Sequence, residues 1–122
     1  MEFCWSTIYV KNMEESVKFY QEVLGLPVKQ RFAPGPDMEI AFLGEGETKV
    51  ELIFDSSVKS IDLGSDISWG FRVDSLDQSM KFLKDRGIEI AAGPFEPNPN
   101  TRFIFILDPN GMKIQLVEEQ RK

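Results

Sequence analysis

Hydrophobic and polar residues alternate over residues 3–10, and a period of two is typical of a β-strand with one buried face. Ile8 and Val10 fall on one side of this strand, which we expect to pack under a helix. The other side carries Trp5, Thr7 and Tyr9. The pattern therefore predicts a strand whose second face is available for a functional role.

A helical period follows this strand. Asn12 with Glu15 forms a capping pattern that opens helices, and Gly25 stands where a helix C-terminus favours a residue tolerant of positive φ. The apolar positions at helical spacing between them are Met13, Val17, Tyr20 and Leu24. Three short strands are then predicted over residues 28–33, 38–43 and 48–54. The predicted order is βαβββ.

The same order is predicted a second time along the chain. FAPGPD from Phe32 matches FEPNPN from Phe95, and KVELI from Lys49 matches KIQLV from Lys113. The offset between the two copies stays between 62 and 64 residues, which indicates a duplicated unit. Strands of the second copy are predicted over residues 88–94, 101–107 and 112–118.

The helix of the second copy carries the same signals as the first. Ser75 with Gln78 repeats the capping pattern, and Gly87 takes the place of the C-terminal glycine. The apolar positions at helical spacing are Leu76, Met80 and Leu83. A helix is therefore expected between the first and second strands of this copy as well.

A chain of 122 residues is the size of one ordinary domain. We predict an α+β fold over residues 1–122, in which two tandem βαβββ modules build mixed sheets that form a curved cup. Module one spans residues 1–54, a polar linker spans 55–66, and module two spans 67–122.

Charge and composition narrow the range of partners. The net charge of −6 argues against nucleic acid, which needs a dense basic face. No apolar run is long enough to span a membrane, and the first residues lack the pattern of a signal peptide, so a cytoplasmic location is expected. The chain contains no histidine, which excludes every catalytic or metal site that depends on imidazole.

Strand alternation in the second copy completes the list of candidate site residues. The face opposite the helix carries Ser68 and Arg72 in the first strand and Gln115 in the last, and Glu51 is the counterpart of Gln115 in the first copy. Phe103 and Phe105 belong to the same candidate ligand-binding surface, although the sequence does not fix which of them points into the cup. The candidate ligand-binding set is Trp5, Thr7, Tyr9, Glu51, Ser68, Arg72, Phe103, Phe105 and Gln115.

The blocks YVKNMEESVKFYQEVLGL and DPNGMKIQLVE, within paired βαβββ units, resemble the vicinal oxygen chelate superfamily of glyoxalase I, bleomycin-resistance proteins and extradiol dioxygenases. The resemblance implies that metal ligands would come from the first and last strand of each unit. Those positions hold Trp5, Glu51, Ser68 and Gln115. Because an indole N–H only donates and a serine hydroxyl is a poor neutral ligand, we expect no metal and no other cofactor. The weaker alternative is a divalent metal bound through Glu51 and Gln115.

Three functions remain open. The first is a metal-independent protein that binds a small molecule in the cup, and the second is a lactoylglutathione-lyase-like lyase or an isomerase in which Glu51 is catalytic. The third is a regulatory or interaction module whose cup is filled by its own side chains. A dioxygenase is not expected, because its iron site needs two histidines. The resemblance also implies a homodimer, since such proteins commonly build each cleft from modules of two chains.

Overall fold

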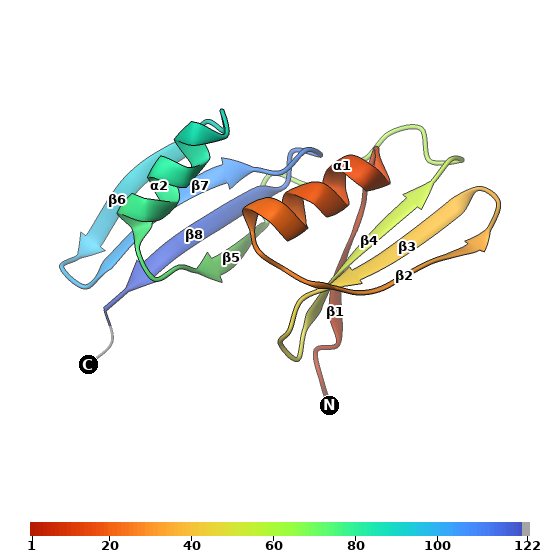
Figure 1. The fold of residues 1–122 in the computed structure, drawn as a ribbon, viewed down its shortest axis with the longest axis horizontal. Coiled ribbons are helices and arrows are strands. Elements are labelled where there is room, and N and C mark those ends of the chain that lie inside the picture. Colours follow the sequence, from red (N-terminus) through yellow and green to blue (C-terminus); the bar gives the residue numbers. More distant parts are fainter. Residues whose placement is uncertain (121–122) are drawn as a thin grey trace. The chain divides into compact units, whose positions relative to one another are not determined.

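The computed structural model describes residues 1–120, and the chain divides into two compact units, Met1–Leu63 and Gly64–Lys122. The first unit contains β1 (Trp5–Tyr9), α1 (Met13–Lys18), the π-helix η1 (Phe19–Val23), β2 (Val28–Gly35), β3 (Met38–Leu43) and β4 (Lys49–Asp55). The second contains β5 (Ser68–Arg72), α2 (Leu76–Asp85), β6 (Ala92–Asn98), β7 (Thr101–Leu107) and β8 (Lys113–Glu119). Figure 1 shows the βαβββ order twice, which confirms the predicted α+β fold of tandem modules.

Each unit contains one four-stranded mixed sheet. The strand orders are β1-β4-β3-β2 in the first unit and β5-β8-β7-β6 in the second. The first and last strands of each unit pair in parallel, whereas the other neighbours are antiparallel. The parallel pair therefore brings the first and last strands of each unit, which carry the candidate residues, side by side.

The predicted helix caps are present in both units. The Asn12 side chain accepts a hydrogen bond from the backbone N–H of Glu15 at 2.9 Å. The Ser75 hydroxyl oxygen accepts one from the N–H of Gln78 at 3.2 Å. Such a cap stabilises a helix by about 1 kcal/mol, because it satisfies a backbone donor that the helix leaves unpaired. Gly25 and Gly87 both have a φ of 71°, the left-handed conformation that favours glycine after a helix.

The core of each unit lies between its helix and one face of its sheet. The buried side chains of the first unit are Ile8, Val10, Met13, Ser16, Val17, Phe19, Tyr20, Ala41, Leu43, Val50 and Leu52. Those of the second unit are Leu76, Leu83, Ile104, Ile106, Asp108, Met112, Ile114 and Leu116. Buried residues fall at alternate positions of β3, β4, β7 and β8, and Ile8 and Val10 do so at β1, which confirms the predicted inward face of β1. The other face of these strands is left open.

Two predicted boundaries of the second unit's edge strand are wrong. β6 begins at Ala92 rather than at residue 88, because Ile88 still completes the end of α2 by donating its N–H to the Leu83 carbonyl at 2.9 Å. β6 also continues through the second proline segment to Asn98. A register shift between Phe95 and Asn98 accommodates the proline, as is typical of an edge strand. The connection from this strand to β7, expected over residues 95–100, is therefore only a turn at residues 99–100. In the first unit β2 likewise extends beyond its predicted end, to Gly35.

The helix of the first unit ends in a π-helix, and the helix of the second unit does not. Leu24 donates its N–H to the Phe19 carbonyl five residues earlier, at 3.3 Å. The interval from the N-cap to the C-terminal glycine is 13 residues in the first unit and 12 in the second. The first copy therefore accommodates one additional residue as a π-helix.

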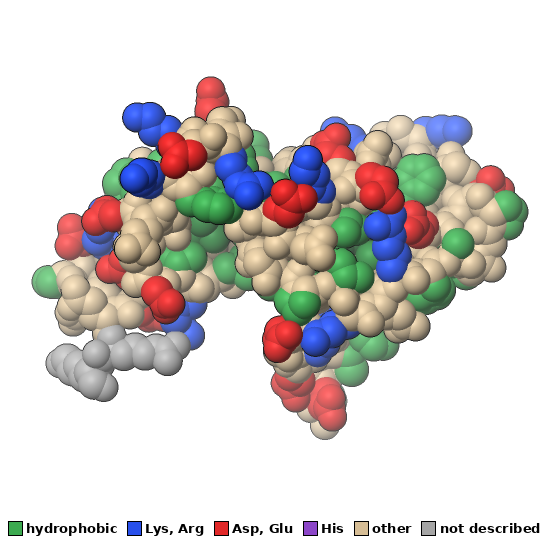
Figure 2. All heavy atoms as spheres, in the orientation of Figure 1, with side chains coloured by type: hydrophobic (Ala, Val, Ile, Leu, Met, Phe, Trp, Pro, Cys, Tyr) green, Lys and Arg blue, Asp and Glu red, His purple; other side chains and the backbone are tan. Residues whose placement is uncertain are grey.

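The surface carries mixed charge. On the face drawn in Figure 2, Lys and Arg side chains are interspersed with Asp and Glu and do not gather into a basic patch. Within residues 1–120, no helix has the length and apolar character needed to cross a membrane.

Candidate functional site

The candidate residues lie on the strand face opposite each core. The first open face consists of Trp5, Thr7, Tyr9, Met38, Ile40, Phe42, Lys49, Glu51 and Ile53. The second open face includes Ser68, Gly70, Arg72, Phe95, Thr101, Phe103, Phe105, Lys113, Gln115, Val117 and Glu119. Every predicted site residue falls on one of these faces, and each face belongs to a single unit.

Aromatic rings occupy much of the first open face. Trp5 is 54% exposed, and its ring meets Phe42 edge to face with the centroids 5.5 Å apart. Tyr9, on the same side of β1, is 40% exposed. A large indole held this far in solvent is a feature of binding surfaces, because apolar rings are usually buried.

The sequence prediction did not include Phe42. Its partner across the strands is Glu51, which places it directly beside the candidate carboxylate. Phe42 is the equivalent of Phe105 at the repeat offset of 63 residues. The duplication therefore contained the signal that would have identified it.

Thr7 and Glu51 are bonded to each other on the first open face. They are register partners in the parallel pair of β1 and β4, and the Thr7 hydroxyl donates to Glu51 Oε1 at 2.5 Å. A hydrogen bond to an ionised carboxylate is stronger than a bond between neutral groups. Among residues 1–120 no hydrogen bond to Glu51 Oε2 is found, so this oxygen keeps its capacity to accept one.

Three phenyl rings form a cluster on the second open face. Phe103 lies 5.3 Å from Phe95 and 5.7 Å from Phe105 between ring centroids. Both Phe103 and Phe105 point to the open side, because Ile104 and Ile106 take the buried positions between and after them. The structure thus resolves the choice that the sequence left open.

Lys113 adjoins this aromatic cluster, and Phe95 belongs to it from the edge strand β6. Lys113 Nζ lies 5.4 Å from the centroid of the Phe105 ring, within the range of a cation–π interaction. Phe95 lies on the neighbouring edge strand and is 44% exposed. The sequence prediction did not include Phe95 as a site residue, although its match to Phe32 in the proline segments marked the position.

Arg72 and Ser68 both lie on β5, on the second open face. Arg72 donates to Glu119 Oε1 from Nη2 at 2.8 Å and from Nε at 3.2 Å. Its charge is therefore already paired on the open face. Ser68 is exposed and lies in register with Lys113, at the start of the strand.

The residues present do not fit the metal site that the superfamily resemblance implies. Trp5 has no lone pair to offer, and Glu51 already shares its Oε1 with Thr7. Among the described residues, no three His, Cys, Asp or Glu side chains are grouped so that they could hold a metal ion. The donor set on these faces suits hydrogen bonding and stacking rather than coordination of a transition metal.

An ion-pair cluster on the helix side of the first unit lies outside the candidate site. Arg31 bonds Glu39 of β3 and Glu14 of α1. The hydrogen bonds that Arg31 donates, first to Glu39 and then to Glu14, raise the pKa of Arg31 above its ordinary value. These contacts connect α1 to the sheet, and we assign them to stability.

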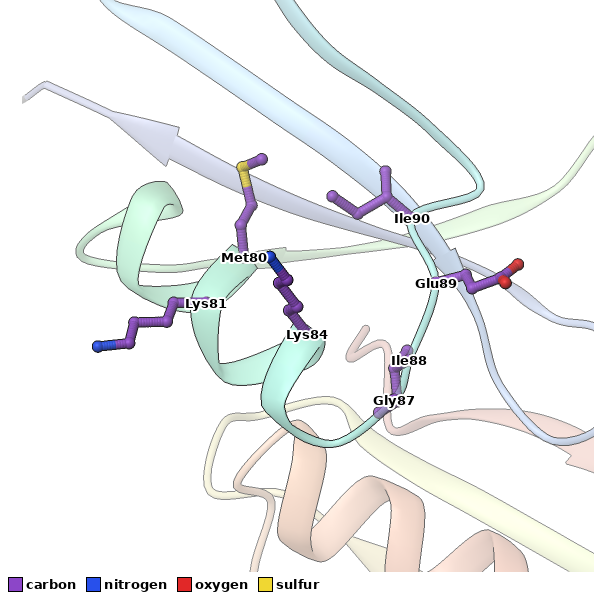
Figure 3. Close-up of a pocket in the computed structure, with 7 residues that line it drawn as sticks. All are labelled: Met80, Lys81, Lys84, Gly87, Ile88, Glu89 and Ile90. Carbon is purple, nitrogen blue, oxygen red and sulfur yellow. The ribbon is translucent and has the colours of Figure 1, made fainter.

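A groove of about 830 Å³ lies between α2 and the segment that follows it, as Figure 3 shows. Its apolar lining includes Met80, Ile88 and Ile90. The charged side chains of Lys81 and Glu89 point away to opposite sides. None of the predicted site residues lines the groove, and no set of polar groups converges in it.

Comparison with known proteins places the chain in a family. A model of the Glyoxalase/Bleomycin resistance protein/Dioxygenase superfamily matches residues 4–116, and the chain belongs to that superfamily. This confirms the resemblance found in the sequence.

Relatives in the superfamily include enzymes. The lactoylglutathione lyase of Salmonella typhimurium is 29% identical over an alignment that covers 97% of this chain and 93% of that protein. The lactoylglutathione lyase of Neisseria meningitidis is 28% identical, with coverage of 98% and 92%.

Solved structures show the same fold. A glyoxalase family protein from Bacillus cereus superposes with a TM-score of 0.84 at 19% identity, covering 99% of this chain and 95% of that chain. An antibiotic binding protein from Streptomyces sp. CB03234 superposes with a TM-score of 0.75 at 22% identity, covering 98% and 97%.

Proposed function

We propose that this protein binds a planar small molecule without a metal, and that the first open face supplies the main contacts. The single observation that carries the proposal is an exposed indole, Trp5, on the same strand face as a carboxylate, Glu51, that Thr7 holds in place. An indole and a restrained carboxylate favour stacking and hydrogen bonding to a guest over coordination of a metal.

The chemistry of this face suits a planar cation. A flat guest stacked on Trp5 gains aromatic contact worth about 0.5–1.5 kcal/mol beyond its area burial. A protonated amine on the guest can donate to Glu51 Oε2, the oxygen that Thr7 leaves unused. Stacking and a charge-assisted hydrogen bond together favour a conjugated ring system that carries a basic nitrogen.

One solved structure of the same fold supports a binding function. One protein of the same fold is described as an antibiotic binding protein. That description names binding as the neighbour's role, and Trp5 and Ser68, at positions where the superfamily resemblance implies metal ligands, are compatible with binding without a metal.

Titration with proflavine, a planar aromatic cation, tests the proposal. Proflavine should raise the melting temperature and bind equally well with and without a chelator, because no metal takes part. Trp5→Ala should weaken proflavine binding by about tenfold. Trp69→Phe should leave it unchanged, because Trp69 lies on the helix side of β5 and not on an open face. The proposal is contradicted if proflavine does not raise the melting temperature at any concentration. It is also contradicted if the addition of a chelator abolishes proflavine binding.

A second candidate function is a glyoxalase-type lyase or isomerase. The observation that favours it is the identity of 28–29% to lactoylglutathione lyases over nearly the whole chain. Glu51 would then be the group that moves a proton at the substrate carbon.

Formation of lactoylglutathione by the purified protein tests this second candidate. The lyase function predicts turnover that Glu51→Gln abolishes and Glu118→Gln leaves in place, because Glu118 binds the backbone of α2 instead. Absence of turnover with and without added divalent metal would rule out the lyase. If proflavine also fails to bind, the interaction module with a filled cup becomes the remaining prediction.

A further inference from the structure

The turn between β7 and β8 contains Asn110 followed by Gly111, and none of the other three asparagines of the chain precedes a glycine. In this dipeptide the glycine backbone nitrogen can attack the side-chain amide carbon of asparagine, because glycine has no side chain that obstructs the approach. The turn therefore holds the two groups that react in asparagine deamidation.

The reaction needs only water besides these two groups. The Gly111 nitrogen loses its proton and forms a bond to Asn110 Cγ, while the bond from Cγ to Nδ2 breaks and ammonia leaves with the proton. Water then opens the cyclic imide at either of its carbonyl groups, which gives aspartate or isoaspartate at position 110. The net change is the consumption of one water molecule and the release of one ammonia molecule.

The folded turn restrains the attacking nitrogen. Gly111 donates its N–H to the Asp108 carbonyl at 3.1 Å, and the turn is closed by a second bond, from the Asp108 N–H to the Met112 carbonyl, at 2.9 Å. A backbone nitrogen whose N–H is bonded to a carbonyl loses its proton less readily and is held away from the neighbouring side chain. Attack on Asn110 therefore requires the turn to open.

The buried side chain of Asp108 restrains the group that would be attacked. Asp108 Oδ2 accepts a hydrogen bond from Asn110 Nδ2 at 3.2 Å. Asp108 Oδ1 accepts from the backbone N–H groups of Asn110 and Met112, both at 2.8 Å. The attack also develops negative charge on Gly111 and Asn110, which the adjacent carboxylate disfavours. Asp108 thus opposes the reaction by its position and by its charge.

We propose that Asn110 is a latent deamidation site, which Asp108 protects as long as the turn between β7 and β8 is closed. The inference is independent of the proposed binding function. In the aspartate product, a carboxylate replaces the amide that donates to Asp108 Oδ2, so that two negative charges meet and the hydrogen bond cannot form again. Deamidation therefore leaves a lasting change in chains whose turn has opened.

Deamidation of the full chain, followed by mass spectrometry of the peptide that contains Asn110, tests the proposal. The native wild type should react at least about tenfold more slowly than the same chain unfolded in guanidinium chloride, because only the open turn reacts. Hydrogen exchange at the Gly111 N–H of the native protein should be slow as well, since that N–H is bonded to the Asp108 carbonyl.

Asp108→Asn separates the contacts of Asp108 from the overall stability of the unit. The new amide oxygen can accept both backbone hydrogen bonds, but the new amide nitrogen meets Asn110 Nδ2 as a second donor. No second reactive dipeptide arises, because Pro109 has no backbone N–H. The deamidation rate of the native protein should rise by about fivefold, as expected from the loss of one hydrogen bond.

Glu118→Ala is the matched control for this variant. It removes a hydrogen bond to α2 in the same unit and leaves the contacts of the turn in place, so it should change the deamidation rate by less than about twofold. Equal acceleration by Asp108→Asn and Glu118→Ala would overturn the protective role of Asp108, because the opening of the whole unit would then control the rate.

Two results with the wild type alone also overturn the proposal, and they hold even if Asp108→Asn does not fold. One is an equal deamidation rate at Asn110 in the native and the unfolded chain, or no deamidation in the unfolded chain. The other is exchange of the Gly111 N–H as fast as in an unstructured peptide, since the attacking nitrogen would then not be restrained.

Discussion

Thr7 and Glu51 are joined by a hydroxyl–carboxylate hydrogen bond of 2.5 Å that links the two parallel strands of the first unit. The bond uses one carboxylate oxygen and leaves the other available. A carboxylate restrained in this way loses less conformational freedom when a ligand arrives, which favours affinity. We therefore expect the affinity of the first open face for a guest to depend on both side chains of this pair.

Thr7→Val should weaken the binding of a cationic guest while leaving the fold intact. Valine keeps the shape of threonine and removes the hydroxyl, so Glu51 loses its restraint. We expect proflavine affinity to fall by about threefold to tenfold, corresponding to a hydrogen bond of ~1 kcal/mol. Thr7→Ser retains the donor and should bind like the wild type in the same fluorescence titration. Equal affinity of the valine and serine variants would show that the hydroxyl plays no part.

Glu51→Gln should remove the ionic part of guest binding. The amide keeps the size of the side chain but lacks the negative charge that pairs with a cation. Proflavine affinity should fall with rising salt concentration in the wild type and should be nearly independent of salt in the variant. Titrations over a series of salt concentrations measure this slope. The same slope in both proteins would exclude Glu51 as the group that meets the cation.

Glu118→Ala should destabilise the second unit without affecting the open faces. The Glu118 carboxylate accepts a hydrogen bond from the backbone N–H of Leu76 at 2.7 Å, and so satisfies a donor in the first turn of α2. Its loss should lower the free energy of unfolding by about 1–2 kcal/mol in urea titrations. Glu96→Ala removes an exposed carboxylate from β6 and should change stability by less than about 0.5 kcal/mol. Comparable losses in the two variants would contradict a capping role.

Arg31→Met should destabilise the first unit in a manner that depends on salt. Methionine preserves most of the apolar stem but leaves Glu14 and Glu39 without their shared cation. The loss in the free energy of unfolding should be about 1 kcal/mol at low salt and should shrink as salt is added. Lys29→Met on the same strand breaks only an exposed pair with Glu45, so its effect should be smaller. A larger effect of Lys29→Met would reverse this assignment.

The alternation of the strands and the repeat were sufficient to predict most of the fold. Burial at positions such as Val50 and Ile114 follows from the period of two, which is a local property of the chain. The start of β6 was not predictable in this way, because Ile88 and Ile90 alternate with Glu89 as in a strand, although Ile88 completes the end of α2.

The candidate site was predicted as a set of positions but not as a set of contacts. Sequence periodicity identifies which side of a strand Arg72 occupies, yet its pairing with Glu119 depends on a strand that lies 47 residues further along the chain. The same holds for the approach of Gln115 Oε1 to Gly70, its register partner in β5, where an added Cβ would lie 3.0 Å from that oxygen. Contacts of this kind arise only when the sheet has formed.

The π-helix at residues 19–23 has a consequence for how the two halves of the chain can change. An extra residue in a regular helix would rotate everything after it by about 100° and would expose Tyr20 and its neighbours. The wider turn absorbs the extra residue locally, so Gly25 has the same φ as Gly87, and the strand order within each unit is the same. This length change is thereby confined to one turn of helix, and the paired strands β1 and β4 could keep the same register as β5 and β8 while their side chains diverged, as Thr7 and Gly70 have done.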